Sequence, residues 1–180
     1  NWLGQDIDGS YTGAFPKAWH EYRFGALRAV QESYSPVIPG DVDTSALPVA
    51  VFRWRLENTG SEPIDAAVMA HWANMSGWFD GWGTERPYRR NAGNSNSAIT
   101  NEGYRGVLFD RVRFDEVPPE GVGQFALLGQ ADPGVEISVC PTFDGLGDGS
   151  DVWSAFAETG AVPEDLGWWL ADTGFAEAET

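Results

Sequence analysis

The chain has 180 residues, which is enough for one domain with a substantial core. It carries 27 acidic and 11 basic side chains, and the net charge of −16 repels nucleic acids and anionic membranes, so neither is expected as a direct partner. Nine Trp and ten Phe argue against a disordered chain, while 22 Gly and 11 Pro favour many short strands joined by turns.

The single lysine and the single cysteine bear on the environment of the protein and on its covalent cross-links. Lys17 is the only lysine, and a surface rich in carboxylates suits either a protein adapted to high salt or an ordinary acidic protein from a GC-rich genome. Cys140 is the only cysteine, so no disulfide can form within the chain. The sequence has no N-terminal Met, no leader and no apolar run of about 18 residues, so we expect a cytoplasmic segment of a longer polypeptide without a membrane span.

The first part of the chain predicts two strands between loops. Residues 1–16 are rich in Gly and Asp and predict a loop. Residues 18–24 and 27–34 alternate between two faces, which predicts two strands separated by a break at Gly25. Residues 37–47, with their acidic and hydroxyl side chains, predict another loop.

The best-patterned stretch is residues 47–72, which predicts a β-hairpin. Alternate positions are apolar in residues 50–56, and residues 64–72 repeat this period of two. Turn-forming residues occupy 58–63, and Pro63 lacks a backbone N–H, so it suits the entry to the second strand. We therefore expect two long antiparallel strands that pair with each other.

Regular patterning is lost over residues 74–101, which predicts a long loop of the kind that often carries function. The loop sets flat rings beside polar groups, an arrangement on which sugars can stack. We select four candidates for contact with a substrate or a neighbouring domain: Trp78, Asp80, Trp82 and Tyr88. The competing explanation is that these rings only cover a sheet edge or pack on another domain.

Short strands return in the C-terminal part of the sequence. Three stretches predict strands: 104–114, 124–130 and 135–140. Residues 151–158 predict a short helix capped by Asp151. Together the elements predict an all-β fold, an antiparallel β-sandwich with long loops and at most one short helix. We expect the whole chain, residues 1–180, to form a single domain of this kind.

No group of residues stands out as a metal or nucleophile site. His20 and His71 lie on predicted strands without neighbouring ligands, and a zinc site takes ligands in groups of three or four. Cys140 has no base near it in the sequence, so we expect a structural thiol. The run 144–151 loosely resembles a calcium loop but lacks the closing Glu, and a flexible acidic turn explains it better.

The acidic residues do not single out a catalytic pair either. Glycoside hydrolysis uses two carboxyl groups, one of which has its pKa raised by an apolar setting. Among the 27 acids no pair has such a setting in the sequence. We therefore expect no catalytic residue, no metal and no cofactor in this chain.

Four motifs follow one another in the first half of the chain: S-P-x-I-P-x-D at 35–41, S-x-L-P-V-A-V-F at 45–52, N-T-G at 58–60 and W-x-N at 72–74. Together they resemble the N-terminal domain of family 116 glycoside hydrolases, the group of non-lysosomal glucosylceramidase and prokaryotic β-glucosidases. Downstream, G-V-L-F-D, G-Q-F-A-L and V-W-S-A-F-x-x-x-G occur in the family's order. The resemblance extends from about residue 15 to residue 160.

The resemblance implies one part of a two-part enzyme. In the family, an N-terminal β-sandwich packs on a C-terminal (α/α)6 barrel, which holds the nucleophile and the acid/base carboxylate. The implied partners are therefore a C-terminal catalytic domain of the same polypeptide and, through it, a glucoside or a glucosylceramide-like substrate. This chain would brace the barrel and shape its entrance through residues 78–88.

Two other functions remain open from the residues alone. One is a stand-alone carbohydrate-binding β-sandwich, which the rings of the long loop would suit. The other is a free-standing structural or adhesion domain. A helical segment of several hundred residues encoded after Thr180 would favour the two-part enzyme over both.

Overall fold

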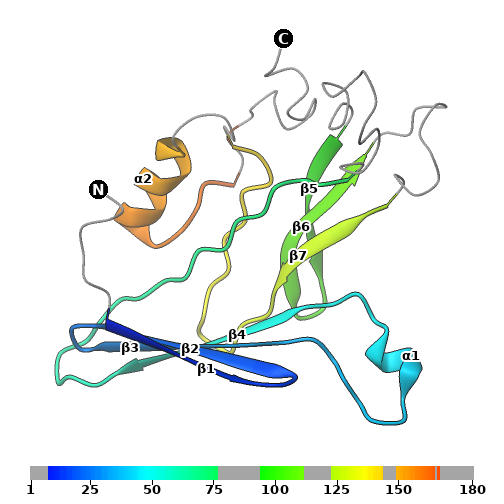
Figure 1. Ribbon diagram of the computed structural model, residues 1–180. Coiled ribbons are helices and arrows are strands. Elements are labelled where there is room, and N and C mark those ends of the chain that lie inside the picture. Colours follow the sequence, from blue (N-terminus) through cyan, green and yellow to red (C-terminus); the bar gives the residue numbers. More distant parts are fainter. Residues whose placement is uncertain (1–7, 77–93, 112–122, 144–148, 165, 167–180) are drawn as a thin grey trace, which may run out of the picture. The chain divides into compact units, whose positions relative to one another are not determined.

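Figure 1 shows the computed structural model of the chain, which describes residues 8–76, 94–111, 123–143, 149–164 and 166. Contacts divide the chain into two compact units, Asn1–Ala66 (unit 1) and Ala67–Thr180 (unit 2). Each unit contains one antiparallel sheet, drawn from blue to cyan in unit 1 and from green to yellow-green in unit 2 (Figure 1).

Unit 1 is a four-stranded meander in which each strand pairs with the next along the chain. The strands are β1 (Asp8–Ala14), β2 (Lys17–Phe24), β3 (Leu27–Tyr34) and β4 (Val51–Asn58). Gly25 has a φ of 60°, which suits glycine and closes the tight turn between β2 and β3. A single helical turn, α1 (Val42–Ser45), precedes β4 and is capped by Asp41, whose side chain accepts from the Thr44 N–H at 2.9 Å.

The unit 1 sheet has two different faces, because successive side chains on a strand point to opposite sides. The register places most of the rings on one side, the aromatic face, whose larger members are Tyr11, His20, Tyr22, Phe24, Leu27, Phe52, Trp54 and Leu56, while Trp19 and Tyr34 lie on the opposite side. The other side, the charged face, carries Lys17, Glu21, Arg23, Arg28, Glu32, Arg53, Arg55 and Glu57. Opposite-charge neighbours on adjacent strands support this pairing register.

Unit 2 is built on a three-stranded antiparallel meander. Its strands are β5 (Asn94–Asn101), β6 (Tyr104–Arg111) and β7 (Phe125–Gly129). The buried core consists of Val107 and Phe109 from β6 together with Val139, and the Phe109 ring stacks on Phe125 with centroids 4.6 Å apart. Helix α2 (Ser150–Thr159) follows, bounded by two left-handed glycines, Gly149 and Gly160.

The predicted hairpin over residues 47–72 is wrong in its pairing. Its first arm is β4, but β4 pairs with β3, and residues 64–72, all of them described, form no strand. The turn after β4 is tied elsewhere: the N–H and the hydroxyl of Thr59 both donate to the Ala26 carbonyl at 2.8 Å. A period of two indicates that a segment has two different faces, but it does not indicate which other strand the segment pairs with.

Two strands were missed because their sequences are polar and rich in turn formers. Residues 8–14 were predicted as loop but form β1, which pairs with β2 along its full length. Residues 94–101 fall in the predicted long loop but form β5, which pairs with β6. In each case a well-patterned neighbouring strand supplies the ladder, and tertiary pairing overrides local composition.

Several other boundaries are confirmed or corrected. The strands predicted at 18–24, 27–34 and 124–130 are confirmed, and so is the helix at 151–158. The helix begins one residue before Asp151, so Asp151 lies in the first turn. Residues 135–140 form no strand, although Ile137 and Val139 pack on the unit 2 core.

The fold class is confirmed as all-β, with two antiparallel sheets and little helix. That the two sheets face one another as a sandwich, and that residues 1–180 are a single domain, stay predictions. Within the described residues no helix is long and apolar enough to cross a membrane.

Candidate functional site

The four residues selected from the sequence, Trp78, Asp80, Trp82 and Tyr88, lie outside the described residues. The structure does describe both flanks of their segment, which are Ser76 on one side and Asn94 on the other. Both flanking residues are buried, with 5% and 1% of their surface exposed, at one end of the β5–β6 pair. These two flanks are the described part of the candidate site.

Asn74 ties the two flanks together. Its side-chain amide donates to the Asp110 carbonyl at 3.0 Å, to Asn96 Oδ1 at 2.8 Å and to the Ser95 carbonyl at 3.2 Å. Its Oδ1 accepts from the Ser76 N–H at 3.0 Å. One side chain thus fixes the chain before the segment to both β5 and β6.

The return flank is fixed to the same residue. Asn94 Nδ2 donates to the Asn74 carbonyl at 3.1 Å, and Asn96 Nδ2 donates to the Pro141 carbonyl at 3.0 Å. We call these residues, Asn74, Ser76, Asn94 and Asn96, the asparagine cluster. The cluster holds residues 76 and 94 close together at one end of the β5–β6 pair, so both ends of the intervening segment are fixed at the same place on the unit 2 sheet.

Among the described residues, two buried oxygens of the cluster have no hydrogen-bond partner: Ser76 Oγ and Asn94 Oδ1. Buried polar atoms are nearly always paired, and leaving one unpaired costs about 1–3 kcal/mol.

Sequence reasoning missed the cluster. Asn74 belongs to the W-x-N motif, whose spacing alone does not indicate that its amide bonds to two strands. Asn is a turn-forming residue type, so Asn94 and Asn96 favour a loop when only local composition is considered. The available signal was the repeated Asn at alternate positions 94 and 96, which places both amides on one face of a strand.

Three carboxylates of the charged face, Glu21, Glu32 and Glu57, are engaged by cations. Glu21 accepts from Arg28 at 2.8 and 2.9 Å and from Arg23 at 2.7 Å, and Arg28 also donates to Glu57 at 2.9 Å. The Arg28 hydrogen bond is the main cause that lowers the pKa of Glu21 to about 2. A carboxyl group in this setting stays ionised at all physiological pH values.

A second ion-paired group lies on the same charged face. Glu32 accepts from Lys17 and lies 3.6 Å from Arg53, and the Lys17 hydrogen bond lowers the pKa of Glu32. A general acid for glycoside hydrolysis needs the opposite shift, towards a raised pKa. Glu21 and Glu32 therefore suit a structural role.

Replacing Glu21 by Gln is expected to reduce the acid sensitivity of the fold. The pKa of Glu21 lies below its ordinary value of 4.5 in the folded chain, so the pair stabilises fully above about pH 4.5 and loses its effect as the pH falls towards 2. Thermal melts followed by circular dichroism at several pH values from about 6 to 2.5 should show a smaller fall in Tm for Glu21→Gln than for wild type. Glu62→Gln, at an exposed turn, is the matched control; equal falls in Tm for wild type and Glu21→Gln would contradict the assignment.

His20 and Cys140 have ordinary structural surroundings. His20 packs its ring 4.9 Å from that of Tyr11 and lies 3.3 Å from the Gln31 side chain. Cys140 Sγ donates to the Thr142 carbonyl at 3.0 Å. Within the described part of the chain, no three His, Cys, Asp or Glu side chains are grouped as metal ligands would be.

A comparison with models of protein families gives one match that spans nearly the whole chain. The model is described as beta-glucosidase 2, glycosyl-hydrolase family 116 N-term, and it matches residues 1–169. The match includes both sheets, the asparagine cluster and the segment that holds Trp78 and Trp82.

Proposed function

This chain belongs to the N-terminal domain family of glycoside hydrolase family 116, and we propose that it is the non-catalytic part of a β-glucosidase-type enzyme. Its partner is a C-terminal catalytic domain of the same polypeptide. That catalytic domain acts on the substrate, which is a glucoside or a glucosylceramide-like molecule. A cytoplasmic location is part of the same proposal.

The observation that carries the non-catalytic role is the state of the carboxylates on the charged face. Glu21 and Glu32 are bound to Arg28 and Lys17, and hydrogen bonding lowers the pKa of both carboxyl groups. Hydrolysis of a glucoside needs one carboxyl group that holds a proton near neutral pH. Ionised, paired carboxylates instead support a sheet that keeps its shape beside a catalytic neighbour.

We assign the contact with substrate or catalytic domain to the segment between residues 76 and 94. The asparagine cluster fixes both flanks of this segment to β5 and β6, which supports a role in presenting its side chains from a rigid base. In this proposal Trp78, Trp82 and Tyr88 supply rings at the entrance, and Asp80 supplies a polar group beside them.

The test uses the complete polypeptide and 4-nitrophenyl β-glucoside. Glu21→Gln/Glu32→Gln should keep kcat within about twofold of wild type, because neither carboxylate reacts with substrate. Trp78→Ala/Trp82→Ala should raise KM by about tenfold and change kcat less, because entrance rings bind the ground state and the transition state alike. The 180-residue chain alone should show no hydrolysis.

Trp153→Ala is the matched control, because Trp153 is also an exposed tryptophan but lies on α2, and its KM should stay at the wild-type value. A fall in kcat of about a thousandfold in the Glu21/Glu32 variant with an unchanged Tm would overturn the non-catalytic role. An unchanged KM in the Trp78/Trp82 variant would remove the entrance role and leave the non-catalytic role standing.

A further inference from the structure

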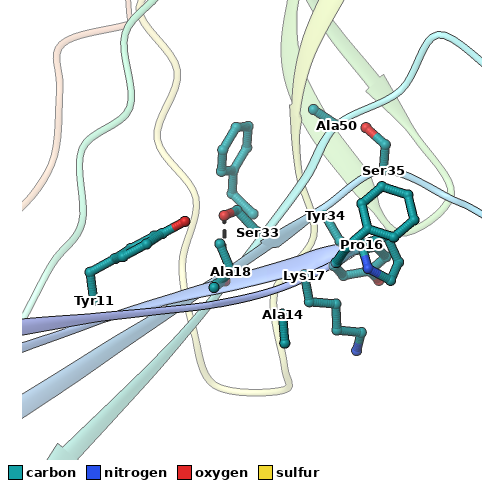
Figure 2. A pocket seen from close by; sticks show the side chains of 12 residues that line it. Tyr11, Ala14, Pro16, Lys17, Ala18, Ser33, Tyr34, Ser35 and Ala50 are labelled. Carbon is teal, nitrogen blue, oxygen red and sulfur yellow. Dashed lines mark hydrogen bonds between the residues drawn. The ribbon is translucent and has the colours of Figure 1, made fainter.

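Unit 1 contains a hollow of about 560 Å³ where the β1–β2 turn meets the end of β3 and the start of β4. Figure 2 shows Tyr11 at one end of this hollow and Pro16 and Tyr34 at the other, with Ser33 between them. The hollow is shallow and largely open to solvent, so a ligand would lie on its surface and would not be enclosed. The whole lining comes from unit 1.

Two aromatic rings of the lining are highly exposed to solvent. Tyr11 is 65% exposed, and Phe15, at the tip of the β1–β2 turn, is 88% exposed. The Tyr11 ring lies directly over Gly13, where an added Cβ would come within 2.8 Å of its hydroxyl oxygen and 3.3 Å of the ring carbon next to it. Tyr11 is thus laid along its own strand, with a ring face available to a ligand.

The remaining lining combines two serine hydroxyl groups with apolar and aromatic side chains, and its one charge is paired. Ser33 and Ser35 place hydroxyl groups in the hollow, and Ser33 Oγ donates to the Ala18 carbonyl at 3.5 Å (Figure 2). Lys17 is the one charged residue of the lining, and Glu32 neutralises it through an ion pair. The Lys17 ammonium also lies 5.0 Å from the centre of the Tyr34 ring.

These features select a neutral, hydroxylated ligand with flat apolar faces. An anion would meet no free cation in the lining and would approach a chain of net charge −16. An aliphatic ligand would leave the serine hydroxyls unpaired on one side. A pyranose ring meets both requirements, because its C–H faces stack on rings and its rim carries hydroxyl groups.

We propose that this hollow is a sugar-binding site of unit 1, which takes neutral β-linked glucose units outside the catalytic domain. Tyr11 and Phe15 stack on the sugar, and Ser33 and Ser35 hydrogen-bond to its hydroxyl groups. The inference goes beyond the bracing role and uses the family only for the choice of glucose as the sugar. The site would hold a glucose-containing chain near the catalytic domain.

The experiment titrates the 180-residue chain with cellotetraose and with glucuronic acid by isothermal calorimetry. Saturable heat is expected with cellotetraose and none with glucuronic acid. Tyr11→Ala/Phe15→Ala should weaken cellotetraose binding by about tenfold or more. Phe15→Leu keeps apolar bulk at an exposed position, so it should fold normally and still lose several-fold in affinity because the flat ring is gone.

Phe24→Ala is the matched control, because Phe24 is also an exposed ring of the aromatic face, 45% exposed, but lies at the other end of β2. It should bind cellotetraose as wild type does. Absence of saturable heat in wild type, an equal loss in Phe24→Ala, or unchanged affinity in Phe15→Leu would each overturn the proposal. Because the sample lacks a catalytic domain, such a failure would leave the bracing role untouched.

Discussion

Gly106→Ala should destabilise unit 2 more than any other single methyl group added to the described glycines. A Cβ at position 106 would lie 2.0 Å from the Leu127 carbonyl oxygen and 2.9 Å from the Leu128 Cα, and both atoms belong to the backbone of β7. A rotamer change cannot relieve this clash, so β6 and β7 must separate. We expect a loss of about 3 kcal/mol or more in the free energy of unfolding.

Urea denaturation with hydrogen exchange read by mass spectrometry would test this result. Amides of β6 should exchange faster in Gly106→Ala, while those of β2 in unit 1 should keep their protection. Gly123→Ala is the matched control, since a Cβ there meets no atom within 4 Å, and its urea midpoint should stay close to wild type. A wild-type midpoint for Gly106→Ala would contradict the pairing of β6 with β7.

Asn74→Ala is expected to have the second-largest effect, a loss of about 2–4 kcal/mol. The change removes three donor contacts to β5 and β6 and the acceptor of the Ser76 N–H in one step. The Asp110 carbonyl and Asn96 Oδ1 would each lose a partner in a part-buried place. The cost is therefore that of a broken network rather than of one hydrogen bond.

A second substitution separates the two halves of the Asn74 side chain. Asn74→Asp keeps an oxygen to accept from Ser76 but loses every donor, so it should destabilise at least as much as Asn74→Ala. Asn101→Ala, on the same strand as Asn94 but exposed, should cost less than about 1 kcal/mol. Similar urea midpoints for Asn74→Ala and Asn101→Ala would contradict the central place of Asn74.

The sequence predicted strands well where side chains alternate strongly. Residues 18–24 and 27–34 alternate in character along the strand, and both strands were found with little error. β1 and β5 were missed because Gly, Ser and Asn dominate them, and their strand state depends on a partner. The partner of β4 was missed for the same reason, since pairing is a long-range choice that local periodicity does not contain.

The candidate site could be predicted only in part. The rings of residues 78–88 were found as a cluster along the chain, but they lie outside the described residues, so their role stays a prediction. The asparagine cluster depends on side-chain bonds between residues about 20 to 45 positions apart, such as Asn74 to Asp110 and Asn96 to Pro141. Contacts of this kind form only when both sheet strands are already in place.

Arg28 has a consequence for how unit 1 resists misfolding. It lies on β3 and donates hydrogen bonds to Glu21 on β2 and to Glu57 on β4, so one guanidinium group links three strands in a single register. A slip of β4 by one residue would turn Arg53, Arg55 and Glu57 into the aromatic face and place Leu56 or Asn58, instead of Glu57, opposite Arg28. Arg28 thus favours the native register of β2, β3 and β4 over shifted registers, because only the native register pairs it with both glutamates. In a strongly anionic chain this pairing also offsets the repulsion between Glu21 and Glu57.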